Sequence, residues 1–222
     1  MKSIKLFVLA FLLMIGCRSV AQDNHEYVDL GLPSGTLWAT CNVGATTPEG
    51  YGDYFAWGET QAKAIYDWGT YKFAEGDYHQ MTKYCDKSFY GYNGFTDNLT
   101  VLQPGDDAAT ANWGSGWCIP SMEQWQELYE KTTVKWTTQN GVCGWLFTAS
   151  NSNSLFLPAA GDRWGNELYG VGRFGYYWSS SCFTNFPINA NCRHFDSDGY
   201  GKSACGRYLG RSVRAVRSSG QN

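Results

Sequence analysis

Residues 176–217 read YYWSSSCFTNFPINANCRHFDSDGYGKSACGRYLGRSVRAVR, and this stretch decides the fold expected of the chain. Two strand-like runs, Tyr176–Ser179 and Val213–Val216, enclose a segment of mixed chemistry without a repeated pattern. The enclosed segment holds no obvious set of metal ligands or acid–base partners. It therefore predicts a recognition surface mounted on a rigid scaffold, and hence a binding protein.

Outward from this stretch, short β-type runs alternate with turns rich in Gly, Asn, Asp and Ser. Besides the two flanks, the predicted strands are Thr36–Thr40, Trp145–Thr148 and Ser154–Leu157. Residues 65–98, dense in Tyr and Gly, predict an irregular loop.

One helix is well marked. Ser121 is a typical N-cap, and Gln124 three residues later completes the spacing of a capping box. Met122, Trp125 and the pair Leu128 and Tyr129 then recur at helical spacing. A second, shorter helix is predicted over Asp106–Asn112. The fold class is therefore α+β, with a small mixed or antiparallel sheet, one or two helices and extensive loops.

Five tryptophans in apolar contexts are expected in the core, namely Trp38, Trp57, Trp117, Trp125 and Trp178, whereas Trp164 is a candidate for exposure.

The N-terminus predicts export. Lys2 and Lys5 precede an apolar run over Leu6–Gly16, which is too short to span a membrane and typical of a secretory signal. Residues 1–21 are the predicted signal peptide, and residues 22–222 one domain. The sequence around Cys17 also resembles a lipobox, in which a lipid on Cys17 would attach the protein to a membrane. The protein is expected to be secreted or held at the cell surface as a lipoprotein.

Composition and charge narrow the function classes. The chain has 222 residues, a formal charge of −3 and no Lys/Arg cluster, which argues against nucleic acid as a partner. Aromatic residues make up 17%, which suits both cores and carbohydrate- or protein-binding surfaces. Of the eight cysteines, seven remain if Cys17 is lost or lipidated, and none forms a CxxC metal signature. We expect these seven to be surface side chains with room for one disulfide.

Catalytic and metal chemistry are not predicted. The carboxylates available for a glycosidase pair are Asp106, Asp107, Asp162 and Glu167, and the first two are better explained as helix N-terminal charges. The three histidines lie far apart in the sequence and belong to no nucleophile motif. Asn189, Asn191, Asp196 and Asp198 are candidates for calcium ligands of the lectin type, but the chain lacks a Glu-Pro-Asn type of sequence. No enzyme activity, cofactor or metal is therefore expected.

Several longer motifs resemble a known family. They are Tyr27–Ala45, Tyr51–Thr60, Trp113–Trp125, Phe156–Gly161, Tyr177–Ser180 and Ser212–Arg217. Together they resemble the Fibrobacter succinogenes major paralogous domain family, whose members are exported and abundant in gut Bacteroidetes. The resemblance implies a fold similar to C-type lectins and to the formylglycine-generating-enzyme superfamily. Cys118 stands where the family has arginine, so any ion pair of that arginine is missing here.

Some members of this family look like targets of diversity-generating retroelements, which randomise AAC and AAT codons. Changing the two adenines of such a codon cannot produce Glu, Lys, Gln, Met or Trp. Only Lys202 is of these five types among the 29 residues 182–210, against 33 of the 160 residues 22–181. A Gly/Asn/Ser-rich loop would also lack long side chains, but it would contain fewer Phe, Cys, Arg and Tyr residues. The resemblance thus implies a hypervariable segment.

We expect ligand binding by residues 182–210. The candidate contact residues are Phe183, Thr184, Asn185, Phe186, Ile188, Asn191, Arg193, His194, Asp196, Asp198, Tyr200, Arg207 and Tyr208. The aromatic ones would be apolar anchors. The expected partner is a protein or glycan on another cell, a phage or a host surface. Two alternatives stay open: a structural or adhesive subunit such as a pilus-tip component, and an extracellular carbohydrate-active enzyme.

Overall fold

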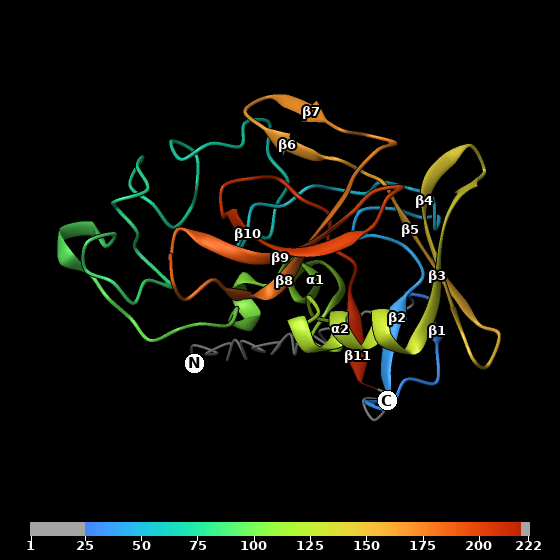
Figure 1. Cartoon of the computed structure of the whole chain (residues 1–222). Helices are drawn as coiled ribbons and strands as arrows, with labels where there is room; N and C mark the ends of the chain where they lie inside the picture. Colours follow the sequence, from blue (N-terminus) through green and yellow to red (C-terminus); the bar gives the residue numbers. More distant parts are fainter. Residues whose placement is uncertain (1–24, 219–222) are drawn as a thin grey trace, which may run out of the picture.

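The computed structural model describes residues 25–218 and shows an α+β fold in which all strand pairs within the sheets are antiparallel (Figure 1). The expected α+β class with two α-helices is confirmed, although the strands form several small antiparallel sheets where one sheet was expected. The strands are β1 (Tyr27–Asp29), β2 (Thr36–Ala39), β3 (Thr132–Gln139), β4 (Val142–Ala149), β5 (Ser154–Pro158), β6 (Asp162–Trp164), β7 (Glu167–Tyr169), β8 (Gly175–Cys182), β9 (Asn189–Phe195), β10 (Tyr200–Gly206) and β11 (Val216–Ser218). They form sheets of order β1-β2-β11, β3-β4-β5 and β10-β9-β8, and the hairpin β6-β7.

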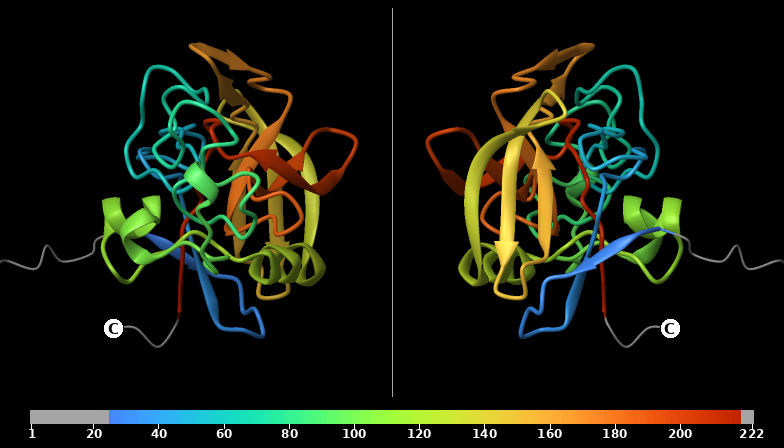
Figure 2. Two further views of the ribbon diagram at one scale, coloured as in Figure 1. Left: turned by 90° about the vertical axis from the view of Figure 1, so that its left-hand side faces the viewer. Right: turned by 90° about the vertical axis from the view of Figure 1, so that its right-hand side faces the viewer.

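The two α-helices begin where the sequence places their caps. Asp107 caps α1 (Ala108–Trp113), its Oδ1 accepting from the backbone N–H groups of Ala109 and Thr110. Ser121 and Gln124 form the predicted capping box of α2 (Met122–Lys131). Helix α2 buries Trp125, Leu128 and Tyr129 and runs beneath β3-β4-β5 in the views of Figure 2. Short 3₁₀ turns occur at η1 (Tyr92–Gly94) and η2 (Pro104–Asp106).

The sheet β8-β9-β10 separates two hydrophobic clusters. Trp178 and Cys192, paired across β8 and β9, belong to the cluster that contains Trp57. The neighbouring positions Tyr177 and Phe195 belong to the other cluster, which contains the core residues of α2 and β4. Because alternate residues of a strand point to opposite faces, β8 and β9 are buried on both sides. Strand β10 is the edge of this sheet.

The structure corrects several element predictions. The segment 182–210 contains two strands that were not predicted, β9 and β10, which together occupy about half of it. The predicted strand Val213–Val216 is displaced, since regular pairing begins only at Val216. Strands β1, β3, β6 and β7 were not predicted. Residues 65–98 are irregular as expected, with only η1 as a regular element, and they form the long excursion at the left of Figure 1.

The five tryptophans expected in the core are all buried. No helix within residues 25–218 is long and apolar enough to cross a bilayer. The predicted signal peptide and the lipobox cysteine, Cys17, lie outside the described residues.

Candidate ligand-binding surface

Strand β9 forms a buried scaffold inside the segment 182–210. Ala190, Cys192 and Phe195 are fully enclosed between the two hydrophobic clusters. Their burial fixes the backbone from which the flanking turns project. The segment therefore divides into a buried strand and two exposed parts, one at each end of it.

Two predicted contact residues need correction, because Arg193 and Arg207 are only 3% and 0% exposed. Arg193 donates to Gln126 Oε1 at 2.8 Å and lies over the ring of Tyr129. Arg207 donates to the backbone carbonyls of residues 83 and 84 and lies over the ring of Trp57. Both guanidinium groups are buried and bonded within the fold, so neither is an exposed contact residue.

The loop between β8 and β9 is the first exposed part. Thr184, Asn185 and Phe186 are exposed, and the Phe186 ring is 51% accessible. Phe183 stacks on Phe186 with ring centroids 6.5 Å apart. Lys87, in the irregular segment 65–98, contacts this loop, because its Nζ donates to the carbonyl of Asn185. An exposed aromatic ring on a tethered loop is a suitable apolar anchor.

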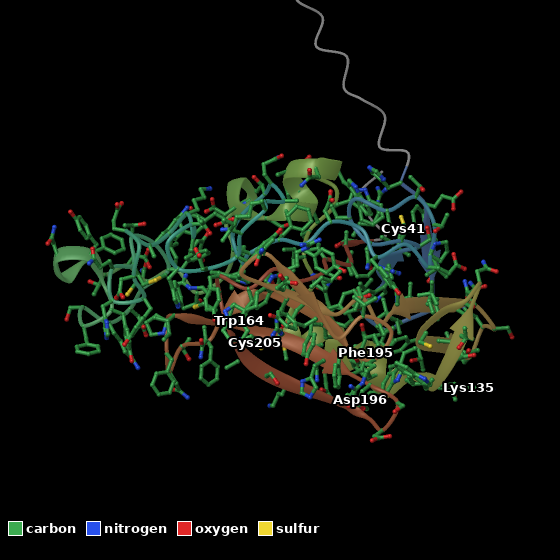
Figure 3. All side chains as sticks on the ribbon, turned by 90° about the horizontal axis from the view of Figure 1, so that it is seen from above. Cys41, Lys135, Trp164, Phe195, Asp196 and Cys205 are labelled. Carbon is green, nitrogen blue, oxygen red and sulfur yellow. The ribbon has the colours of Figure 1, made fainter. Side chains whose placement is uncertain are left out.

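The turn between β9 and β10 is the second exposed part. Asp196 closes it, its Oδ1 accepting from the N–H groups of Asp198 and Gly199 at 2.8 and 3.0 Å. Trp145 Nε1 donates to the Asp196 carbonyl at 2.8 Å, which fixes the turn beside β4; Figure 3 shows Asp196 at that end of the hairpin. Tyr200, 49% exposed, stacks on Tyr129 of α2 at 4.0 Å. The turn Asp196–Gly199 and Tyr200 are thus accessible to a ligand while hydrogen bonds and ring stacking fix their positions.

Alternate residues of β10 continue this exposed surface along the sheet edge. Tyr200, Lys202 and Ala204 are exposed, whereas the residues between them are half-buried. We name the exposed loop Thr184–Phe186, the turn Asp196–Gly199 and these three side chains the recognition surface. Since β9 has seven residues at about 3.3 Å each, its two ends lie about 20 Å apart.

The remaining predicted residues are half-buried and are used largely within the fold. Asn191 donates to Ser181 Oγ and to the Cys182 carbonyl, both at 3.0 Å. His194 Nδ1 lies 2.9 Å from Ser203 Oγ. Ile188 and Tyr208 pack against the Trp57 cluster. These four residues lie beside the recognition surface and shape its support.

Sequence reasoning missed a groove that adjoins this surface. An open depression of about 810 Å³ lies between α2 and the sheet, and Arg193 and Lys202 line its sheet side. Its other walls are Pro33, Met122, Glu123, Gln126, Glu127, Glu130 and Lys131. The polar face of α2 indicates only that this face is exposed, and the groove itself depends on walls as far apart in the sequence as Pro33 and Lys202.

The hairpin β6-β7 flanks the end of the segment. Arg163 and Gly210 exchange two backbone hydrogen bonds, at 2.7 and 3.0 Å. Trp164 is 61% exposed, as the sequence suggested, and Tyr169 of β7 lies 6.2 Å from it between ring centroids. These aromatic side chains add a second exposed apolar group near the segment.

Most carboxylates considered for catalysis are already bound within the protein. Asp106 accepts from Lys72, Lys83 and Tyr84. Asp107 caps α1, and Asp162 pairs with Arg211 at 3.3 Å. Glu167 lies exposed on β7.

Within residues 25–218 no group of three or more His, Cys, Asp or Glu side chains is arranged to hold a metal ion. Comparison with protein-family models, with curated proteins and with solved structures gave no significant match to this chain.

Proposed function

We propose that this chain is an exported binding protein with a C-type-lectin-like fold, which recognises a protein or glycan on another cell, a phage or a host surface. The observation that carries the proposal is the division of residues 182–210 into a buried strand and two ordered, exposed ends. Such an arrangement holds the contact residues in place before binding, which reduces the entropic cost of association.

The ligand is macromolecular under this proposal. A monosaccharide is too small to contact both Phe186 and the turn Asp196–Gly199, because β9 separates them by about 20 Å. A protein epitope or an extended glycan chain is long enough to do so. Phe186 and Tyr200 would provide apolar anchors, while Thr184 and Lys202 provide polar contacts. No residue is assigned a catalytic role and no cofactor is required.

From the resemblance to diversified proteins we also propose which positions of residues 182–210 differ between lineages. Substitutions among lineages should fall at exposed positions such as Thr184, Phe186 and Tyr200. They should be absent at Ala190 and Phe195, where a changed side chain would disturb both clusters. The scaffold would remain constant while the ligand differs between lineages.

Sequencing the gene from independent isolates tests this proposal codon by codon over residues 176–217. The expected result is variation at the recognition surface and constancy at the buried positions of β9. Equal variation at buried and exposed positions would show that the surface is not the diversified element. A segment as invariant as the rest of the chain would argue for a fixed-ligand adhesin or an enzyme.

A binding assay tests the surface directly. The purified protein would be applied to arrays of glycans and of bacterial surface proteins, alongside a variant carrying Phe186→Ala and Tyr200→Ala. Phe89→Ala is the matched control, because Phe89 is also exposed but lies outside residues 182–210. We expect the double variant to lose at least tenfold in affinity and the control to bind like the wild type. Equal loss in both would contradict the assignment.

A further inference from the structure

Two cysteines of the β9-β10 hairpin lie in direct contact. The Sγ atoms of Cys192 and Cys205 are 2.6 Å apart. Cys192 is paired with Ser203, and Cys205 is paired with Ala190, so both cysteines project from the same face of the hairpin. A disulfide bond between sulfur atoms measures about 2.05 Å, so only a small movement separates this contact from a covalent link.

A single cation lies against both sulfur atoms. Arg211 Nη1 is 2.7 Å from Cys192 Sγ and 3.0 Å from Cys205 Sγ. The guanidinium is held on its other side by Asp162, whose Oδ2 lies 3.3 Å from Nη2. It also lies over the rings of Tyr176 and Trp178, at 4.5 and 5.1 Å. The positive charge is therefore fixed beside the sulfur pair.

The two cysteines differ in accessibility. Cys192 is fully buried, whereas Cys205 on the edge strand is half-buried. Figure 3 shows Cys205 on the side of the molecule that carries Trp164, and the Asp162–Arg211 ion pair connects the two places. Cys205 is therefore the more accessible of the two thiols.

The charges make Cys205 the more acidic thiol. The hydrogen bond from Cys192, together with the charge of Arg211, lowers the pKa of Cys205 to about 7, although burial opposes this. Burial raises the pKa of Cys192, which therefore keeps its proton. Asp162 raises the pKa of Cys205 slightly and the nearby Tyr176 hydroxyl stays protonated. The thiolate is the nucleophile in thiol–disulfide exchange, so Cys205 is the attacking group.

We propose that Cys192 and Cys205 are a thiol–disulfide pair, in which Cys205 attacks an external disulfide and Cys192 then resolves the adduct into a cross-link between β9 and β10. The oxidant is a low-molecular-weight or protein disulfide. In the first step, the Cys205 thiolate bonds to one sulfur of the oxidant and releases the other as a thiolate. In the second, Cys192 loses its proton and attacks Cys205 Sγ, which releases the second thiol.

The atoms and electrons balance. Two cysteine thiols are oxidised, one external disulfide is reduced to two thiols, and the two cysteine protons end on those thiols. The product ties the edge strand, which carries Tyr200, Lys202 and Ala204, covalently to the buried strand. The inference concerns the redox state of the hairpin and does not require the proposed ligand.

Glutathione disulfide is a suitable oxidant for the test. The reduced full chain is exposed to buffers of graded glutathione disulfide content, remaining thiols are alkylated, and peptides are identified by mass spectrometry. We expect a Cys192–Cys205 cross-link, with Cys118 and the other cysteines alkylated. Recovery of both Cys192 and Cys205 as alkylated thiols, or pairing of either with a different cysteine, overturns the proposal.

Single-cysteine variants distinguish the attack by Cys205 from the resolution by Cys192. Cys192→Ser should stop the reaction after the first step and accumulate glutathione on Cys205, whereas Cys205→Ser should acquire no adduct at Cys192. Cys118→Ser, which removes an exposed cysteine elsewhere, should still form the cross-link. If Cys192→Ser does not fold, the peptide map of the wild type decides alone. The alkylation rate at Cys205 is also measured as a function of pH. A midpoint at or above the ordinary thiol pKa of about 8.5 contradicts the role of Cys205 as the attacking group.

Discussion

Arg214 and Asn42 join the two ends of the described chain. Arg214 Nε donates to Asn42 Oδ1 at 2.9 Å, and both side chains are fully buried. Arg214 Nη1 also donates to the backbone carbonyls of Ala39, Thr40 and Phe156, at 3.0–3.2 Å. One guanidinium therefore connects β2, β5 and the segment between β10 and β11. Arg214 and Asn42 come from two of the motifs on which the family resemblance rests.

Replacing Arg214 by alanine should destabilise the protein strongly. The change leaves Asn42 Oδ1 and three buried carbonyls without this donor, and a buried unsatisfied group costs about 1–3 kcal/mol. We expect the free energy of unfolding in urea to fall by more than about 3 kcal/mol. Arg214→Lys should recover only part of the loss, because an ammonium lacks the planar set of donors.

Arg173→Ala is the matched control for this measurement. Arg173 is exposed, so its loss should change the free energy of unfolding by less than about 0.5 kcal/mol. A loss below about 1 kcal/mol for Arg214→Ala would show that water or backbone adjustment satisfies the buried carbonyls.

Asp107 should matter more than an ordinary helix cap. Its Oδ1 caps α1, and its Oδ2 accepts from the backbone N–H of Ile119 at 2.8 Å. Asp107→Ala removes both functions and should cost about 2–3 kcal/mol in thermal unfolding. Asp107→Asn keeps the cap but presents an amide N–H to Ile119, so an intermediate loss is expected. Equal stability of Asp107→Asn and the wild type would mean that the Ile119 contact contributes nothing.

Two phenylalanines of the same segment should respond in opposite ways. Phe195 is buried between Trp145 and Tyr177, so Phe195→Ala should reduce the free energy of unfolding by about 3–5 kcal/mol. Phe186 is exposed, so Phe186→Ala should leave stability within about 0.5 kcal/mol while it weakens ligand binding. Urea titration and the array assay measure the two effects. A large stability loss in Phe186→Ala would assign that ring to the core instead.

Local signals were sufficient to predict part of this architecture. The cap residues of α1 and α2 act on backbone groups within three residues, so Ser121 could be identified from sequence and the cap of α1 could be narrowed to Asp106 or Asp107. The periodic apolar face of α2 was equally local. The exposure of Trp164 followed from its neighbours, the charged Arg163 and the turn-forming Gly165.

The missed features depend on partners far along the chain. Strand β9 lacks simple alternation, because Arg193 is buried through contacts with α2, about seventy residues earlier. Arg207 is buried because the rings of Trp57 and Tyr71 and carbonyls from residues 83–84 surround it. The contact between Cys192 and Cys205 depends on hairpin register, which their spacing in sequence does not reveal. Cys85, Cys182 and Cys192 are buried, which corrects the expectation of surface thiols.

The carboxylate of Asp106 should make the irregular excursion sensitive to acid. Lys83 Nζ, Lys72 Nζ and Tyr84 Oη donate to it at 2.6, 3.0 and 2.8 Å, which joins residues 72–84 to the start of α1. Burial raises the pKa of Asp106, but the hydrogen bonds from Lys83, Tyr84 and Lys72 outweigh it, and the pKa is lowered overall. The unfolded value is about 3.9.

A lowered folded pKa means that the carboxylate stabilises the fold above about pH 4, and that this contribution is lost as the pH falls through the folded value. Asp106→Asn removes the charge at every pH. The urea midpoint of the wild type should therefore exceed that of Asp106→Asn by a constant amount above about pH 5, and the difference should shrink as the pH falls below about 4. Asp86→Asn, a change at an exposed carboxylate, should follow the wild type throughout. A difference between wild type and Asp106→Asn that persists undiminished at about pH 2 would show that shape rather than charge at Asp106 holds the excursion.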